Sequence, residues 1–408
     1  MAPSNQRIVS IDFLRGLTIA LMIVVNNPGS WGAWDSENSV WVEHLFLPLS
    51  HSHWNGCTST DLIFPFFIFI VGASIAFAMG GKKLDSSNHK SLILKVVKRG
   101  LIIFALGVLK DAFPYWRYDS STHEYMSWFP DVWRIPGVLQ RIGLVFILGG
   151  ILFIKVNVKS LWLTLVAILL GYWGLLYVEI PDAYQVDLTV PNKNLGSWLD
   201  SKILSENHLW PQSRKDGWDP ESLLGTISAL GTCIMGMIAG SFIKGKKTVL
   251  EKISGLFVFG GISVVIAIAW DMIFPINKIL WTSSYVLYTG GIASMVTGFC
   301  IWLMDYKGYQ KISKPFIIFG SNALTAYLLS ELVSLLIHNI GVGESTVSGI
   351  ISDSILRLFT DTPFSEVYSN HSELITIKLA SHIYAFLWII PFYILLRWMY
   401  NKKIFVKV

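Results

Sequence analysis

The feature that most constrains this chain is a succession of long apolar segments separated by polar ones. A helix needs about 17–25 apolar residues to cross the hydrocarbon core of a bilayer, where only helices and closed barrels satisfy their backbone hydrogen bonds. Segments of this length lie at roughly residues 8–26, 62–80, 94–110, 138–154, 160–179, 223–243, 253–274, 284–304, 315–338 and 376–397. The sequence therefore predicts an all-α integral membrane protein, a bundle of about ten transmembrane helices that forms a single domain over residues 1–408.

The scarcity of charged residues supports this interpretation. Only 14% of the residues are charged and 53% are hydrophobic, whereas a soluble domain carries about 25% charged residues. Three scattered cysteines indicate neither a disulfide framework nor a zinc site, so we expect no metal, and we expect no nucleic-acid partner. A cleavable signal peptide is not expected either, because the first apolar segment contains Asp12 and Arg15.

Basic residues predict the orientation of the helices. Lysines and arginines crowd the stretch from Gly81 to Arg99 and recur after every second helix, whereas residues 27–61 contain no lysine or arginine. Basic loops stay on the cytoplasmic side of a membrane. We therefore expect both termini in the cytoplasm. The protein is expected in a bacterial inner membrane, with the mouth of its site on the periplasmic side.

Polar residues in the first helix form the first candidate site. Asp12 and Arg15 are three residues apart on one helical face, so they form an ion pair or bind a cofactor from the cytoplasm, and the spacing leaves both roles open. At the other end of the helix, Asn26 and Asn27 precede Pro28. Proline accounts for the end of the helix, but two adjacent amides are more than a helix end requires.

The most informative segment runs from His51 to Asp61, directly before the second helix. It brings His51, Trp54, Asn55 and Asp61 to the membrane boundary, next to Asn26. A histidine accompanied by a carboxylate and an amide is the arrangement expected of a general base. A solvated loop histidine is the simpler alternative. A zinc site is disfavoured because no further Cys or His lies at ligand spacing.

Other polar residues gather at the ends of the predicted helices. Proline and acidic residues favour helix starts, and tryptophans favour membrane interfaces, so each of them also has a purely structural explanation. These candidates are Gln140 and Arg141 at the fourth helix, Asp219 and Glu221 before the sixth, Asn277, Lys278 and Trp281 before the eighth, and Asn322 within the ninth.

Six ordered motifs resemble those of the heparan-alpha-glucosaminide N-acetyltransferase family of transmembrane acyltransferases. They are SIDFLRG, HSHWNGCTSTDLIFPFFIFIVG, RIPGVLQRIG, DPESLLGT, PINKILWTSSY and PFIIFGSNA, spread from Ser10 to about Leu329. Members of that family transfer the acetyl group of cytoplasmic acetyl-CoA to the amine of a glucosamine beyond the membrane. The chain resembles the shorter bacterial members, since the N-terminal luminal region of the animal enzymes is absent. It departs from the family at Ser222, where glycine is usual.

The resemblance implies roles for individual residues. The family's proposed catalytic histidine, three residues before Trp-Asn-Gly, falls on His51, and its asparagine at the end of helix one falls on Asn26. His51 is expected to carry the acetyl group or to act as a general base, and the sequence leaves both open. Substrate binding is expected of Trp54, Asn55, Asp61, Asp219, Glu221, Asn277, Lys278, Trp281 and Asn322, and binding of acetyl-CoA is expected of Arg15, Lys98, Arg99, Gln140 and Arg141.

Two other functions stay open. A transporter of amino sugars has a similar hydropathy profile, although such carriers usually show inverted repeats and helices broken at matching positions, which are not visible here. An O-acetyltransferase acting on an envelope polysaccharide is the other alternative. The expected partners are the lipid bilayer, acetyl-CoA and an amino sugar or glycosaminoglycan-like acceptor, and the resemblance suggests a homodimer.

Overall fold

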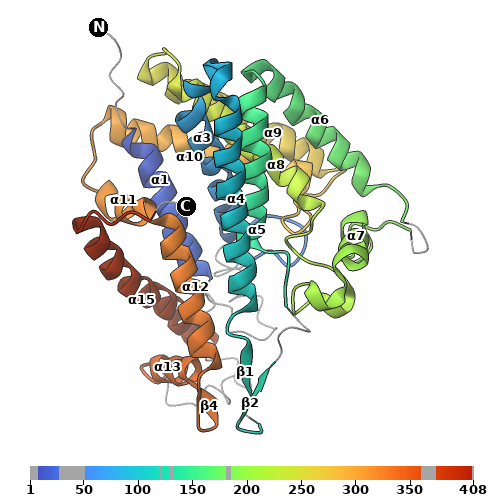
Figure 1. Cartoon of the computed structure of the whole chain (residues 1–408), viewed down its shortest axis with the longest axis vertical. Helices are drawn as coiled ribbons and strands as arrows, with labels where there is room; N and C mark the ends of the chain where they lie inside the picture. The colour runs from blue at the N-terminus through green and yellow to red at the C-terminus, as the bar shows by residue number, and fades with distance from the viewer. Residues whose placement is uncertain are drawn as a thin grey trace.

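The chain is mostly helical, and its long helices pack into one bundle (Figure 1). The computed structural model describes residues 8–26, 51–119, 121–127, 133–180, 185–359 and 374–406. Both chain ends, Asn27 and the segment up to residue 50 lie outside these described residues.

The long helices coincide with the apolar segments of the sequence. They are α1 (Val9–Val25), α3 (Ile63–Met79), α4 (His89–Ala112), α5 (Val138–Lys155), α6 (Val158–Leu176), α8 (Gly225–Lys244), α9 (Val249–Asp271), α10 (Ser283–Cys300), α11 (Ser313–Ser321), α12 (Ala323–Asn339) and α15 (Leu374–Asn401). A π-helical turn, η8 (Ile301–Tyr306), continues α10, and a 3-10 turn, η3 (Thr60–Leu62), precedes α3.

Shorter elements lie in the connections. They are α7 (Leu195–Leu204), α13 (Val347–Leu356), the antiparallel hairpin of β1 (Trp116–Asp119) and β2 (Glu124–Ser127), the smaller hairpin of β3 (Gly341–Val342) and β4 (Ser345–Thr346), and the 3-10 turns η4 (Lys82–Leu84), η5 (Ser86–Asn88), η6 (Glu206–His208) and η7 (Arg214–Asp216). A hydrogen bond from Tyr118 Oη to the Gly343 carbonyl (2.6 Å) joins the two hairpins.

The all-α membrane architecture is supported, but the number of ten spans stays a prediction. Seven of the described helices are long and apolar enough to cross a membrane, or eight if α11 and α12 count as one span. These two helices are bent by 79° at Asn322, so the ninth predicted segment is a broken helix. Helix α1 is only 17 residues long, and α4 carries several charged residues. Neither helix is among the seven.

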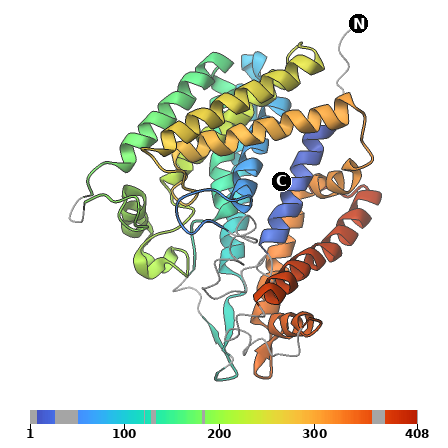
Figure 2. The ribbon, with the colours of Figure 1, turned by 180° about the vertical axis from the view of Figure 1, so that it is seen from behind.

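Helices α3 and α8 pack unusually closely in the middle of the bundle. A Cβ atom on Gly72 would lie 1.9 Å from the carbonyl oxygen of Cys233, and one on Gly236 would lie 1.9 Å from that of Phe69. Only glycine permits such contact between backbones, as is common where helices meet inside membranes. Helix α9 packs beside α10, and α15 lies on the other side of the bundle, against α1 and α11 (Figure 2).

Loops that the basic residues assign to one side of the membrane do contact one another. Lys83 Nζ donates to the carbonyls of Phe153 (2.8 Å) and Val156 (2.9 Å), and Lys244 Nζ donates to that of Phe77 (3.1 Å). We call this end of the bundle the basic face, and the opposite end, with the two hairpins, the hairpin face. Which face is cytoplasmic stays a prediction.

Candidate functional site

Asp61 anchors the segment that precedes α3 at the hairpin face. Its side chain is fully buried, and its Oδ2 atom accepts hydrogen bonds from Ser52 N (3.0 Å), Thr58 N (3.1 Å) and Thr58 Oγ1 (3.1 Å). Backbone N–H groups can only donate, so this oxygen is unprotonated. The start of a helix also favours a negative charge. Asp61 is therefore a fixed carboxylate rather than a free substrate ligand.

This carboxylate orients His51. The Nδ1 atom of His51 lies 2.7 Å from Asp61 Oδ1. In the tautomer in which Nδ1 donates its hydrogen to this carboxylate, the lone pair of the ring is on Nε2. The imidazole is half-exposed, with 48% of its side-chain surface accessible. The arrangement is that of an oriented base or nucleophile that a substrate can reach.

Lys278 completes the cluster from a distant part of the chain. Its Nζ atom lies 2.9 Å from His51 Nδ1, 3.4 Å from His51 Nε2 and 3.3 Å from Asp61 Oδ1. Burial and the nearby Lys278 charge lower the pKa of His51 below its ordinary value of 6.5, against the opposing effect of Asp61. The imidazole is therefore neutral at neutral pH, as a general base requires.

Two asparagines join the loop that carries His51 to the loop that carries Lys278. Gly56 N donates to the Ile276 carbonyl (2.7 Å), and Asn277 Nδ2 donates to Asn55 Oδ1 (3.1 Å). Asn277 is fully buried, and its Oδ1 also accepts from Leu280 N (2.9 Å). Asn55 and Asn277, both predicted to bind substrate, thus join the two loops of the site.

The two candidate tryptophans differ in exposure. Trp281 is almost fully buried, donates from Nε1 to Thr232 Oγ1 (3.1 Å) and meets the ring of Phe64 edge-on. It therefore presents no face to a sugar. Trp54 is partly exposed and donates from Nε1 to the Leu188 carbonyl (2.7 Å), so its role in substrate binding stays a prediction.

Asp219 and Glu221 form a second ionic group with Arg134. Arg134 Nε donates to Asp219 Oδ2 (2.9 Å), and its Nη2 donates to Asp219 Oδ1 and to Glu221 Oε2. Although burial opposes the charge, these two carboxylates raise the pKa of Arg134 above its usual range. Asp219 and Glu221, both predicted to bind substrate, thus bind an arginine of the chain, and their role in substrate binding stays a prediction. Arg134 was not among the predicted site residues.

Gln140 and Arg141 lie at the start of α5, which the structure places at the hairpin face rather than at the basic face. Arg141 Nη2 donates to the Ser222 carbonyl (3.0 Å), and its guanidinium lies 4.9 Å from the ring centroid of Trp281. Gln140 Nε2 donates to Asp111 Oδ2 (2.7 Å). Their predicted role in binding acetyl-CoA stays a prediction.

Asn322 and Asn26 do not join the His51 cluster through any hydrogen bond of the described residues. Asn322 Nδ2 donates to the Ile404 carbonyl (3.0 Å), and its Oδ1 accepts from Val406 N (2.8 Å). Its amide therefore holds the C-terminal tail at the break between α11 and α12. Asn26 is exposed at the end of α1, beside residues outside the described part of the chain, and its catalytic role stays a prediction.

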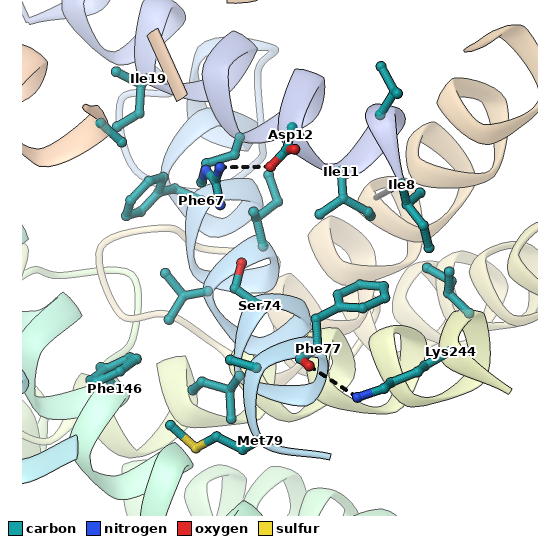
Figure 3. A pocket seen from close by; sticks show the side chains of 18 of the residues that line it. Ile8, Ile11, Asp12, Ile19, Phe67, Ser74, Phe77, Met79, Phe146 and Lys244 are labelled. Atoms are coloured by element: carbon teal, nitrogen blue, oxygen red, sulfur yellow. Dashed lines mark hydrogen bonds and ion pairs between the residues drawn. The ribbon is translucent and has the colours of Figure 1, made fainter. Parts of the chain in front are cut away.

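A cavity of about 1190 Å³ opens among α1, α3, α4, α5, α8, α9 and α12 (Figure 3). Its basic-face end is lined by cations, namely Arg15, Arg99, Lys244, Lys246 and Lys252. Arg15 also forms the predicted ion pair with Asp12 (2.8 Å). The inner wall is apolar, with Ile19, Met22, Phe67, Leu139 and Ile142. Neither Lys98 nor His51 is part of the lining.

Comparisons with known proteins agree with the motifs. A family described as a domain of unknown function, DUF5009, matches residues 7–122. The heparan-alpha-glucosaminide N-acetyltransferase of Mus musculus is 29% identical over 377 residues, covering 81% of this chain and 54% of the mouse protein. That of Homo sapiens is 26% identical over 372 residues, covering 80% of this chain and 53% of the human protein. The chain spans about half the length of these curated relatives. It is thus related to the heparan-alpha-glucosaminide N-acetyltransferases over about four-fifths of its length, which confirms the family resemblance of its motifs.

Proposed function

We propose that this chain is a membrane-embedded N-acetyltransferase that moves the acetyl group of acetyl-CoA to the amine of a glucosamine-type sugar. The observation that carries the proposal is the His51 site: Nδ1 is 2.7 Å from the buried Asp61 carboxylate, and Lys278 Nζ is 3.4 Å from Nε2 of the half-exposed ring. The names of the two relatives support the class of reaction. In this proposal the hairpin face is periplasmic and the basic face is cytoplasmic.

The residues of the site suit acyl transfer in two ways. Acetyl-CoA supplies an activated thioester. His51 Nε2 either accepts a proton from the sugar ammonium, so that the amine nitrogen attacks the carbonyl carbon, or attacks that carbon itself and passes the acetyl group on. In both cases the C–S bond breaks and the amide C–N bond forms. Lys278 Nζ, 3.4 Å from Nε2, is positioned to donate to the oxyanion that develops beside the ring.

The cavity suits the acyl donor. Arg99, Lys244, Lys246 and Lys252 at its basic end fit phosphate groups, and its apolar inner wall fits an extended acyl arm. Its volume of about 1190 Å³ exceeds the roughly 300–1,000 Å³ of typical small-molecule sites. The lining ends at Phe67, six residues from Asp61, which is about 9 Å along a helix. Acetyl transfer therefore requires the acyl arm of the donor to extend from the cavity at Phe67 to the His51 site.

The test is a transfer assay with a matched histidine control. Protein purified in detergent is incubated with radiolabelled acetyl-CoA and a panel of amino sugars, and the product is identified by mass spectrometry. We expect His51→Ala to lose at least about 100-fold in rate, the low end of general-base catalysis. His53→Ala, an exposed neighbour, should keep the wild-type rate. Undiminished turnover by His51→Ala would refute the role of His51, and a product acetylated on oxygen would indicate an O-acetyltransferase.

One observation favours a carrier as the second candidate. The 79° break between α11 and α12 resembles the discontinuous helices of secondary transporters. A carrier would take up labelled glucosamine into proteoliposomes without acetyl-CoA. Uptake of this kind, together with no acetylated product from the wild-type protein, would replace the enzymatic proposal.

A further inference from the structure

A second buried ionic cluster lies outside the His51 site, where α4, α5 and α12 meet. Lys110 Nζ is 2.7 Å from Asp111 Oδ1 and 3.6 Å from Glu331 Oε2, and Gln140 Nε2 donates to Asp111 Oδ2 (2.7 Å). The charged side chains are 10–16% exposed, and Gln140 is 1% exposed. We call these four residues the Glu331 cluster.

The Glu331 cluster has two carboxyl groups for one ammonium, and it has unused acceptors. Among the described ion pairs, Lys110 is the cation that contacts Asp111 and Glu331, whereas Arg134 binds Asp219 and Glu221. Within the described residues, Glu331 Oε1 and Gln140 Oε1 are buried without a hydrogen-bond partner. A buried charge without a partner is costly, and so is an unused buried acceptor. The cluster is therefore suited to a ligand that is cationic and donates hydrogen bonds.

The cluster continues the wall of the cavity toward the hairpin face. On α12 the lining residue Tyr327 precedes Glu331 by four positions, and on α4 the lining residue Ile103 precedes Lys110 by seven. Residues spaced by four or seven share one helical face. On α1 the lining residue Met22 precedes Asn26 by four positions, so Asn26 also lies on the helical face that lines the cavity. A group bound at the Glu331 cluster would therefore lie about one helical turn beyond the inner end of the cavity.

We propose that Glu331, with Gln140 beside it, binds the ammonium group of the acceptor amino sugar. This inference rests on the proposed acetyl transfer and adds a binding site for the amine. Lys110 Nζ lies 2.7 Å from Asp111 and 3.6 Å from Glu331, so Glu331 is the carboxyl group with the weaker partner and the one available to a ligand. The ammonium would donate to Glu331 Oε1, and a neighbouring sugar hydroxyl or N–H to Gln140 Oε1.

Binding of glucosamine is compared with binding of glucose, which has a hydroxyl in place of the ammonium. Calorimetry on the detergent-purified full chain without acetyl-CoA should give tighter binding of glucosamine. Glu331→Gln should weaken glucosamine binding about 10–100-fold, as expected for a lost hydrogen bond to a charged group, and leave glucose binding unchanged. The KM for the amine should rise by a similar factor while the KM for acetyl-CoA stays constant. Glu344→Gln, in an exposed turn, is the matched control.

The outcomes separate this inference from the proposed function. If the wild type acetylates glucosamine but Glu331→Gln keeps the wild-type affinity and KM, Glu331 is only a structural partner of Lys110 and the inference fails alone. Equal binding of glucosamine and glucose by the wild type also overturns it. If the wild type acetylates no amine but selects glucosamine through Glu331, the enzymatic proposal fails and the ammonium site stands. Glu331→Asp and thermal unfolding of each variant test whether any loss follows from misfolding.

Discussion

Replacing Lys278 by methionine tests the electrostatic account of the His51 site. The change removes a positive charge 3.4 Å from His51 Nε2 and keeps an unbranched side chain. Two charges about 4 Å apart interact by about 1 kcal/mol in water and about 4 kcal/mol at the effective dielectric of a protein surface. Because the imidazole is 48% exposed, we take a value near the lower limit, about 1–2 kcal/mol, for the repulsion between Lys278 and the protonated ring.

The sign of the shift follows from its causes. Burial and Lys278 both lower the pKa of His51. Removing Lys278 takes away one of them, so the pKa rises and the ring is protonated at a higher pH. A protonated ring cannot act as a base, and the acid limb of kcat/KM against pH should therefore move to higher pH. At a pH well above the pKa of His51 in both the wild type and the variant, the ring is neutral in both proteins. Activity should then fall less than on the acid limb, by the loss of the Lys278 hydrogen bond to the oxyanion alone.

The assay is a pH–rate profile on the same acceptor for each variant. Lys278→Arg retains the charge and should keep the acid limb near that of the wild type. Lys202→Met, an exposed lysine on α7, controls for the loss of a surface cation. An NMR titration of His51 provides an independent measurement of its pKa. The electrostatic reasoning is wrong if the limb of Lys278→Met stays in place or moves to lower pH.

Three further predictions follow from contacts described above. Asp61→Asn should reduce kcat/KM by about 100-fold or more, because the amide no longer fixes the Nδ1–H tautomer of His51. A single-turnover assay measures this rate. A wild-type rate would exclude the orienting role of Asp61. Arg99→Ala should raise the KM for acetyl-CoA about 10-fold, whereas Lys98→Ala, outside the cavity lining, should not; equal effects would argue against the cavity as donor site. Gly72→Ala should destabilise the fold by about 1–3 kcal/mol or more, because its Cβ would lie 1.9 Å from a carbonyl oxygen. Gly171→Ala is the control, because no atom lies within 4 Å of its Cβ position, and it should not destabilise the fold. Thermal unfolding of both variants measures the difference.

The helices were predictable because hydropathy within a membrane is a local property. Each apolar segment satisfies its own backbone hydrogen bonds as a helix, whatever its neighbours are. The break at Asn322 was not predictable in this way. Apart from Glu331, His338 and small polar residues, the segment 315–338 is apolar, and its one proline, Pro315, stands at its start and not near Asn322. The Asn322 amide instead binds Ile404 and Val406, more than 80 residues away, and such a contact leaves no local signal.

In the candidate site, too, contacts between residues close in the sequence were predictable and contacts between distant residues were not. His51 and Asp61 were predicted together because they lie ten positions apart in one loop, next to a helix start. The resemblance to a family singled out the histidine. Lys278, 227 positions from His51, was predicted only as a substrate ligand, since nothing in its own segment indicates an imidazole beside it. Arg134 had no assigned role for the same reason, because its carboxylate partners follow it by 85 and 87 positions.

These long-range pairs give the polar helix ends a common explanation. Asp61 with Lys278, Asp219 with Arg134, and Glu331 with Lys110 each join a carboxylate from one segment to a cation from another. Taken singly, such residues read as helix caps or interfacial charges. Taken in pairs, they fix how the hairpin-face ends of the helices sit against one another.

The position of His51 is therefore a property of the packed bundle rather than of its loop. Tyr285 Oη, on α10, donates to the Asp61 carbonyl (2.6 Å), and Lys278 enters from the turn before the same helix. The carboxylate that orients the imidazole and the cation that keeps it neutral are thus both tied to the placement of α10 against α3. A shift of that placement moves Asp61 and Lys278 relative to His51 and changes its tautomer, its pKa and its reach together, because all three depend on distances near 3 Å.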